Sequence, residues 1–133
     1  MSPEQPEARA ANRPTDLVVA SADEQHAVVV TASGEVDLFT VPRLDAELVT
    51  ATSGGARVLV VDLSAVTFID SAGLGVLVAA FKRCRAHGGA MHLVVTSRGV
   101  RRPLEVLGLD AVLPVHAGLE EAVAAAAAPG DPS

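Results

Sequence analysis

The fold of this 133-residue chain is decided by residues 58–75, which read VLVVDLSAVTFIDSAGLG. The nearly continuous apolar run Val58–Leu63 is typical of a strand that is covered on both faces of a sheet. After Asp70 the pattern changes, and we expect a helix from Gly73 to about His87. The start of a helix presents unbonded backbone N–H groups and the positive end of the helix dipole. The sequence therefore places Ser71 where its hydroxyl can act as a cap, a nucleophile or a phosphate acceptor.

Strand and helix patterns alternate on both sides of this junction. Thr40 is expected to cap a helix that has Pro42 in its first turn and stops at Gly54-Gly55. Because Pro103 belongs near the first turn of a helix, we expect the helix that ends at Gly108 to start late. The polar stretch 21–25 indicates the turn of a hairpin. The strands are expected at Leu17–Ala20, Ala27–Ala32, Val58–Leu63, Met91–Thr96 and Val112–Val115, and the last helix at Leu119–Ala128.

This order of elements, β-β-α-β-α-β-α-β-α, predicts an α/β fold. Helices between successive strands require parallel neighbours joined by right-handed crossovers, and the opening hairpin adds an antiparallel pair. We expect a single domain over residues 16–128, with a mixed sheet of about five strands and about four helices. Residues 1–15 and 129–133 are expected to be flexible tails.

Composition narrows the possible function classes. The net charge of −6 and the absence of Trp and Tyr argue against direct binding of nucleic acid, which requires cations and stacking aromatic rings. The single cysteine, Cys84, excludes an internal disulfide, and its place on an apolar stripe predicts a buried, unreactive thiol. The four histidines lack the spacing of metal ligands, so we expect neither metal nor cofactor. Without a membrane-length apolar run or a signal peptide, a cytoplasmic location is expected.

The evidence for Ser71 as a catalytic nucleophile is weak. A nucleophile elbow requires Gly-x-Ser-x-Gly, but Ile69 replaces the first glycine. Asp110 and His116 follow in the chain order of a triad, yet they flank one short strand, so we expect no enzymatic activity. Two other roles fit the position. Asp70 or Ser71 can cap the helix, and a phosphoserine held there by free N–H groups would add roughly −1.5 to −2 charge beside Asp70.

Three stretches of the chain share their residues with one protein family. Gly34-Glu35-Val36-Asp37 precedes the first helix, and Phe68–Gly75 contains Asp-Ser-Ala-Gly-Leu-Gly. Gly88-Gly89 precedes the strand at Met91, and Val100–Leu109 follows that strand. Over roughly residues 17–127 the pattern resembles the anti-sigma factor antagonists, the bacterial members of the STAS family, whose α/β topology agrees with the predicted order.

The resemblance implies a regulator without enzymatic activity. Such proteins bind an anti-sigma factor that is also a serine kinase with a GHKL-type ATP site, and this capture releases a sigma factor. The kinase phosphorylates the serine that follows the motif's aspartate, here Ser71, and a PP2C-type phosphatase removes the phosphate. The alternative is a STAS domain of another signalling, nucleotide-sensing or transport assembly that has no cognate kinase.

The resemblance also implies the residues that contact the partner. Ser71 is the one phosphoacceptor of the motif, since Ala72 stands where many relatives have a second hydroxyl. Asp70 would orient the loop. Leu38 and Phe39 are apolar where relatives are often polar, and we expect at least one of them to be buried. The expected partner-binding residues are Asp37, Leu38, Phe39, Asp70, Ser71, Ala72, Gly73, Leu74 and Gly75.

Arg98, Arg101 and Arg102 form a basic cluster close to the start of the third expected helix. Such a cluster could bind an anion, although a solvated helix face is its usual explanation.

Overall fold

The computed structural model describes residues 17–24, 27–54 and 57–127. A five-stranded sheet with the order β1-β2-β3-β4-β5 lies at its centre. Strands β1 and β2 are antiparallel, and the other neighbours are parallel. The strands are β1 Val18–Glu24, β2 Ala27–Val36, β3 Val58–Ile69, β4 Ala90–Val94 and β5 Val115–His116, and the helices are α2 Val41–Ser53, α3 Ser71–Ala86, α4 Arg98–Val106, the 3-10 helix η1 Leu109–Ala111 and α5 Leu119–Ala127. The predicted class and order are confirmed; the two expected tails lie outside the described residues.

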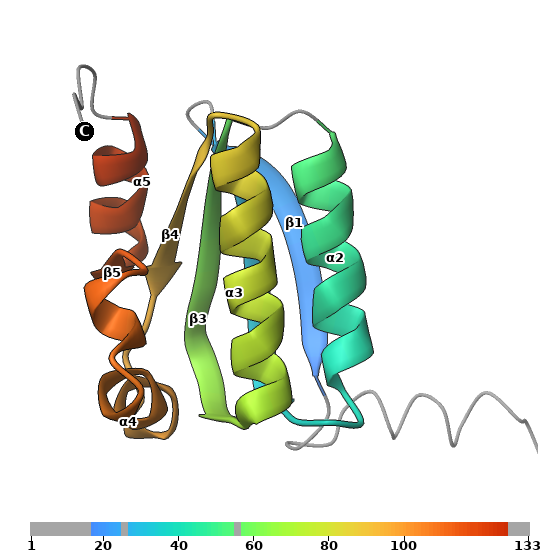
Figure 1. Cartoon of the computed structure of the whole chain (residues 1–133), viewed down its shortest axis with the longest axis vertical. Coiled ribbons are helices and arrows are strands. Elements are labelled where there is room, and N and C mark those ends of the chain that lie inside the picture. Colours follow the sequence, from blue (N-terminus) through green and yellow to red (C-terminus); the bar gives the residue numbers. More distant parts are fainter. Residues whose placement is uncertain (1–16, 25–26, 55–56, 128–133) are drawn as a thin grey trace, which may run out of the picture.

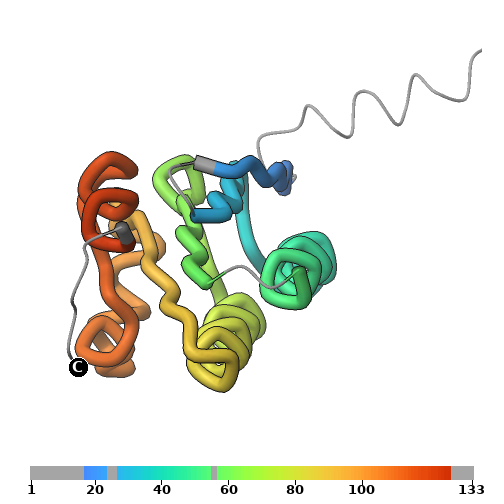
Figure 2. Tube along the Cα trace, turned by 90° about the horizontal axis from the view of Figure 1, so that it is seen from above, coloured from blue at the N-terminus to red at the C-terminus, as the bar shows by residue number. Residues whose placement is uncertain are grey.

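Helices cover both faces of the sheet. Helices α2 and α3 pack on one face and α5 on the other (Figure 1), and the view from above separates these layers (Figure 2). Leu59 and Val61 of β3 belong to the larger apolar core under α2 and α3. Val60, between them, belongs to a smaller core that includes Ala122 and Val123 of α5. The apolar run in β3 is thus buried on both faces, as its sequence predicts.

The first two strands are longer than the sequence predicts. Strand β1 continues to Glu24, through most of the polar stretch expected to form the turn, and β2 continues to Val36. Their antiparallel register runs from Val18 opposite Ser33 to Glu24 opposite Ala27. Because β1 is an edge strand, its polar residues can face solvent and still pair through the backbone. Strand β3 likewise runs to Ile69, which brings it directly to the motif.

The expectation that α4 starts late is wrong. The helix begins at Arg98 and contains Pro103 in its interior. Val100 and Leu104 are both fully buried. Their burial stabilises a helical backbone through Pro103 despite the lost N–H donor, so packing outweighs the local preference of proline.

The last strand is shorter and later than expected. Residues 109–111 form η1, and β5 is confined to Val115–His116. Pro114 still contributes to the sheet edge, because its carbonyl accepts a hydrogen bond of 2.8 Å from Leu93 N. Strand β5 forms one edge of the sheet, where a neighbouring proline is tolerated.

Helix α4 and the residues before it replace a strand partner for the end of β3. Strand β4 stops at Val94, opposite Asp62, while β3 continues to Ile69. The hydroxyl of Thr96 donates to the Ser64 carbonyl at 3.0 Å, and that of Ser97 donates to the Val66 carbonyl at 2.7 Å. These bonds satisfy backbone acceptors that have no strand beside them.

Cys84 is buried on the inner side of α3, as predicted. Burial raises the pKa of its thiol above the ordinary value, and the nearby Arg83 guanidinium lowers it to a smaller extent. Since the thiolate is the reactive form, this environment favours an unreactive cysteine.

Gly99 allows α4 to touch β3, and replacing it provides a test of this contact. A Cβ atom at Gly99 would overlap the Thr67 carbonyl oxygen, whereas a Cβ at Gly75, in the exposed part of α3, would have no atom within 4 Å. We expect Gly99→Ala to lower the free energy of unfolding by about 1–3 kcal/mol. Gly75→Ala should raise it by about 0.5–1 kcal/mol, because alanine is the better helix former. Urea unfolding of both variants measures the difference, and equal stabilities would contradict the contact.

Candidate functional site

The candidate site lies where the parallel strands β2 and β3 end side by side. Val36 and Ile69 are register partners, and the Asp70 N–H donates to the Val36 carbonyl at 3.0 Å. The residues that follow the two strands, Asp37 and Asp70, therefore begin adjacent loops. The predicted site residues 37–39 and 70–75, which are more than thirty positions apart in the sequence, meet at this edge.

The Asp70 carboxylate joins these two loops. One oxygen, Oδ1, accepts a hydrogen bond of 3.1 Å from Gly73 N and so caps helix α3. The other, Oδ2, accepts one of 3.1 Å from Leu38 N in the neighbouring loop. Of the two capping candidates, Asp70 is the cap. Its two hydrogen bonds fix the position of the start of α3 relative to the loop after β2.

The loop after β2 is held by a second set of hydrogen bonds. The Asp37 Oδ1 atom accepts from the N–H groups of Phe39 and Thr40, both at 2.9 Å. The Thr40 hydroxyl accepts from Asp37 N at 2.9 Å and donates to the Glu35 carbonyl at 2.8 Å. Thr40 precedes α2, as predicted, but its hydroxyl makes no cap bond to that helix. It instead closes the loop on itself.

Leu38 and Phe39 are both exposed, so the expectation that at least one is buried is wrong. Leu38 is 67% exposed and Phe39 is 88% exposed. Their backbones are fixed by Asp70 and Asp37, and this local network leaves both side chains outside the core. The loop therefore displays apolar groups on a rigid support.

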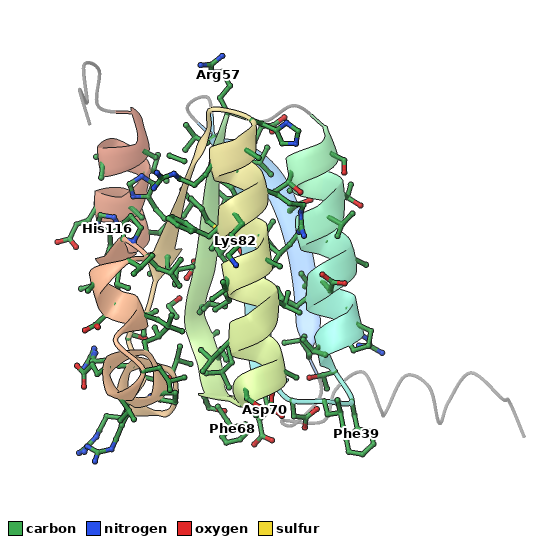
Figure 3. All side chains as sticks on the ribbon, viewed as in Figure 1. Phe39, Arg57, Phe68, Asp70, Lys82 and His116 are labelled. Atoms are coloured by element: carbon green, nitrogen blue, oxygen red, sulfur yellow. The ribbon has the colours of Figure 1, made fainter. Side chains whose placement is uncertain are left out.

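Phe68 adds a third exposed apolar side chain that the sequence did not single out. It is 45% exposed, and Figure 3 shows it at the same end of the molecule as Asp70 and Phe39. If the side chains of β3 alternated strictly between the two faces of the sheet, Phe68 would point inward as Val66 does. The register between β2 and β3 shifts between Gly34 and Glu35, which breaks that alternation. A local irregularity of this kind leaves no clear signal in the sequence.

Ser71 is the first residue of α3 and is exposed to solvent. Within the described part of the chain, its hydroxyl takes part in no hydrogen bond. Its own N–H and that of Ala72 precede the first intrahelical bond, which joins Leu74 N to the Asp70 carbonyl. A group attached to Ser71 would thus stand next to free donors at the positive end of a helix. We call Leu38, Phe39, Phe68 and Ser71 the Ser71 surface.

The glycines and the leucine of the motif have different surroundings. A Cβ at Gly73 would lie 2.5 Å from Ile69 Cγ1 and 2.6 Å from Val36 Cγ1, so glycine is needed for α3 to start against both strands. Leu74 is buried in the core, and Gly75 is exposed. Gly73 and Leu74 position the helix start from inside, while Gly75 lies on its outer side.

The other candidate residues do not assemble around Ser71. His116 pairs with His92 instead, with its Nε2 atom 2.9 Å from His92 Nδ1. Figure 3 shows His116 beside α5, away from Asp70 at the lower end. In residues 17–24, 27–54 and 57–127, no three His, Cys, Asp or Glu side chains are grouped so that they could hold a metal ion. Over the same ranges, no helix is long and apolar enough to cross a bilayer.

Comparisons with known proteins place this geometry in a family. The STAS domain model matches residues 19–122. The anti-sigma-F factor antagonist RsfB of Mycobacterium tuberculosis is 32% identical over 112 residues, which cover 83% of this chain and 89% of the relative.

Solved structures of two other proteins are similar to this chain over most of their length. An anti-sigma factor antagonist from Mycobacterium paratuberculosis has a TM-score of 0.80 and 32% identity, with 86% of this chain and 97% of that chain covered. The Bacillus antagonist SpoIIAA is 25% identical in both its unphosphorylated and phosphorylated forms, with TM-scores of 0.69 and 0.63. The match covers 81% of this chain and 95% of SpoIIAA in the first form, and 80% and 96% in the second. The described fold and these similarities together establish that the chain belongs to the STAS domain family.

Proposed function

We propose that this protein is an anti-sigma factor antagonist that captures its partner while Ser71 is unmodified and releases it when Ser71 is phosphorylated. The observation that carries the proposal is the exposed Ser71 hydroxyl, free of hydrogen bonds within the described residues and set at the start of α3. The names of the similar proteins support the antagonist role, and the solved phosphorylated form of SpoIIAA supports the modification.

The partner would bind the Ser71 surface while it carries no added charge. The exposed side chains of Leu38, Phe39 and Phe68 offer apolar contact area, and the hydrogen bonds of Asp37 and Asp70 hold their loops in advance. A preorganised surface loses little conformational entropy on binding. Aromatic residues such as Phe39 often carry a large share of the binding energy at interfaces.

Phosphorylation would act through charge rather than through refolding. A phosphoryl group on Ser71 adds roughly −1.5 to −2 charge directly beside the Asp70 carboxylate. The free N–H groups at the start of α3 can accommodate this charge, so the domain keeps its shape. A partner fitted to a neutral hydroxyl would then face repulsion and the cost of desolvating the phosphate.

The partner would be an anti-sigma factor with a GHKL-type kinase site, and a PP2C-type phosphatase would restore the hydroxyl. Both assignments follow from the family resemblance, and we expect the protein to act in the cytoplasm. The chain itself would carry no enzymatic activity. The Ser71 hydroxyl has no hydrogen-bonded base among the described residues, and His116 is paired with His92. A serine needs such a base to become a nucleophile.

Phosphorylation can be tested directly. Incubation with the cognate anti-sigma factor and ATP should place one phosphate on Ser71, located by mass spectrometry, and Ser71→Ala should take up none. A phosphate elsewhere, or none in the presence of a proven partner, would refute the switch.

Charge at Ser71 should weaken capture of the partner. Ser71→Asp is expected to raise the Kd at least about tenfold, or ~1.4 kcal/mol, whereas Ser71→Ala should bind nearly as well as the natural protein. Ser53→Asp adds the same charge at an exposed position near the end of α2 and should change the Kd little. Isothermal titration with the anti-sigma factor measures all three. Equal binding by Ser71→Asp and Ser71→Ala would contradict the charge mechanism.

Phe39 should be an anchor of the interface. Phe39→Ala is expected to weaken binding by about 1–3 kcal/mol without lowering thermal stability, because the side chain is 88% exposed in the free chain. Val49→Ala, which shortens an exposed side chain on α2, serves as the control. Unchanged affinity of Phe39→Ala would remove the Ser71 surface from the proposed interface.

Asp70 should support both the fold and the interface. Asp70→Ala removes the helix cap and the bond to Leu38 N, and we expect it to lower the free energy of unfolding by about 2 kcal/mol. Asp23→Ala removes the same charge from an exposed position of β1 and should have little effect. Urea unfolding and partner titration of both variants would show whether the loss of stability and the loss of partner binding occur together. Wild-type stability of Asp70→Ala would contradict the linking role.

A further inference from the structure

Helix α4 carries three arginines on one face. Arg98, Arg101 and Arg102 are exposed, and together with Glu105 they line an open surface hollow of about 330 Å³. Arg101 and Arg102 follow Arg98 by three and four positions, a spacing that places them on the same side of a helix as Arg98. We call Arg98, Arg101 and Arg102 the arginine face.

The charges of the arginine face are not neutralised within the described chain. Arg101 donates a hydrogen bond of 3.2 Å to the Thr96 carbonyl, and none of the three forms an ion pair with another described residue. The first turn of α4 contains no acidic residue. Cations there oppose the helix dipole, and like charges three or four residues apart repel each other. A local arrangement that is unfavourable in the free protein is expected where a ligand compensates it.

Exposed apolar residues follow the arginine face. Val106 at the end of α4, Leu107 directly after it and Val112 after η1 all have more than half of their surface in contact with solvent. Helix α4 thus presents arginines in its first part, and exposed apolar side chains lie at its end and in the segment that follows it. A protein segment with acidic and apolar side chains would satisfy both.

The arginine face is connected to the Ser71 surface through Phe68. The backbone of Gly99 packs against Thr67 and Phe68 at the end of β3. Phe68 lies at the same end of the molecule as Asp70 (Figure 3), and α4 lies at the end where α3 begins (Figure 1). A partner that covers Ser71 and Phe68 can therefore extend onto the neighbouring α4.

We propose that the arginine face binds an acidic segment of the same partner protein that captures the Ser71 surface. This inference rests on the proposed function. A protein segment is favoured over nucleic acid because the chain has a net charge of −6 and no Trp or Tyr for stacking. It is favoured over a small phosphate ligand because Arg98, Arg101, Arg102 and Glu105, which line the hollow, are all exposed and come from one helix. Small-molecule sites bury most of their ligand.

Reversing two of the charges tests the inference. Arg98→Glu combined with Arg102→Glu leaves the Arg101 hydrogen bond in place. The control is Arg57→Glu combined with Lys82→Glu, the same change of charge at two exposed residues that Figure 3 shows at the opposite end of the molecule and midway along α3. Stopped-flow association with the purified anti-sigma factor should be slowed about tenfold or more by the first pair and less than about twofold by the control. Added salt should shrink the difference. Circular dichroism of both double variants verifies the fold.

The outcomes separate this inference from the proposed function. If Ser71→Asp abolishes capture while Arg98→Glu/Arg102→Glu behaves like its control, the inference is wrong and the proposed function stands. If no anti-sigma factor binds the natural protein, the proposed function is wrong. NMR titration of the full chain with a hexaglutamate peptide, inorganic phosphate and duplex DNA then shows whether the arginine face binds an acidic peptide. Amide shifts on α4 caused by the peptide and lost in the double variant support an acidic-segment site. No shift by the peptide, or shifts caused only by phosphate or DNA, overturn it.

Discussion

The carboxylate of Asp70 is the interaction on which the rest of the site depends. Its two oxygens bond to two different segments, the first turn of α3 and the loop after β2. The parallel register of Val36 with Ile69 makes this possible, because it brings both segments within reach of one short side chain. Glutamate would be longer, and asparagine would offer only one acceptor oxygen. A single side chain thus positions the start of α3, with the Ser71 hydroxyl, relative to the exposed Leu38.

A site built in this way is suited to switching by charge. The loop that carries Leu38 and Phe39 is held by hydrogen bonds in the free chain, and the proposed modification of one hydroxyl would change the potential of the Ser71 surface without changing its shape. Discrimination between two states by repulsion is a common route to specificity, since it does not require the protein to adopt a second fold. The arginine face would supply the attractive counterpart, and its sign would be unaffected by the state of Ser71.

Much of the fold, but less of the site, could be predicted from the sequence. Leu59 lies in a continuous apolar run and Leu77 follows a helical apolar pattern, and segments of these two kinds identify both an element and its core residues. The exposure of Phe39 could not be predicted, because it results from hydrogen bonds between polar atoms of a short loop. The exposure of Phe68 depends on a register shift between two strands distant in sequence. In α4, the burial of Val100 and Leu104 outweighs the local preference of Pro103, which no single-residue rule anticipates.

The order of the strands in the sheet is their order in the chain. Each new strand therefore pairs with the strand made just before it, although parallel partners such as Val28 and Leu59 are separated in the sequence by a whole helix and its loops. During synthesis, the sheet can grow by one strand at a time at its open edge as the chain leaves the ribosome. Asp70 would join the loop that carries Leu38 to the start of α3 once that helix has formed. A nascent chain would thus assemble the Ser71 surface before its final helix packs on the sheet.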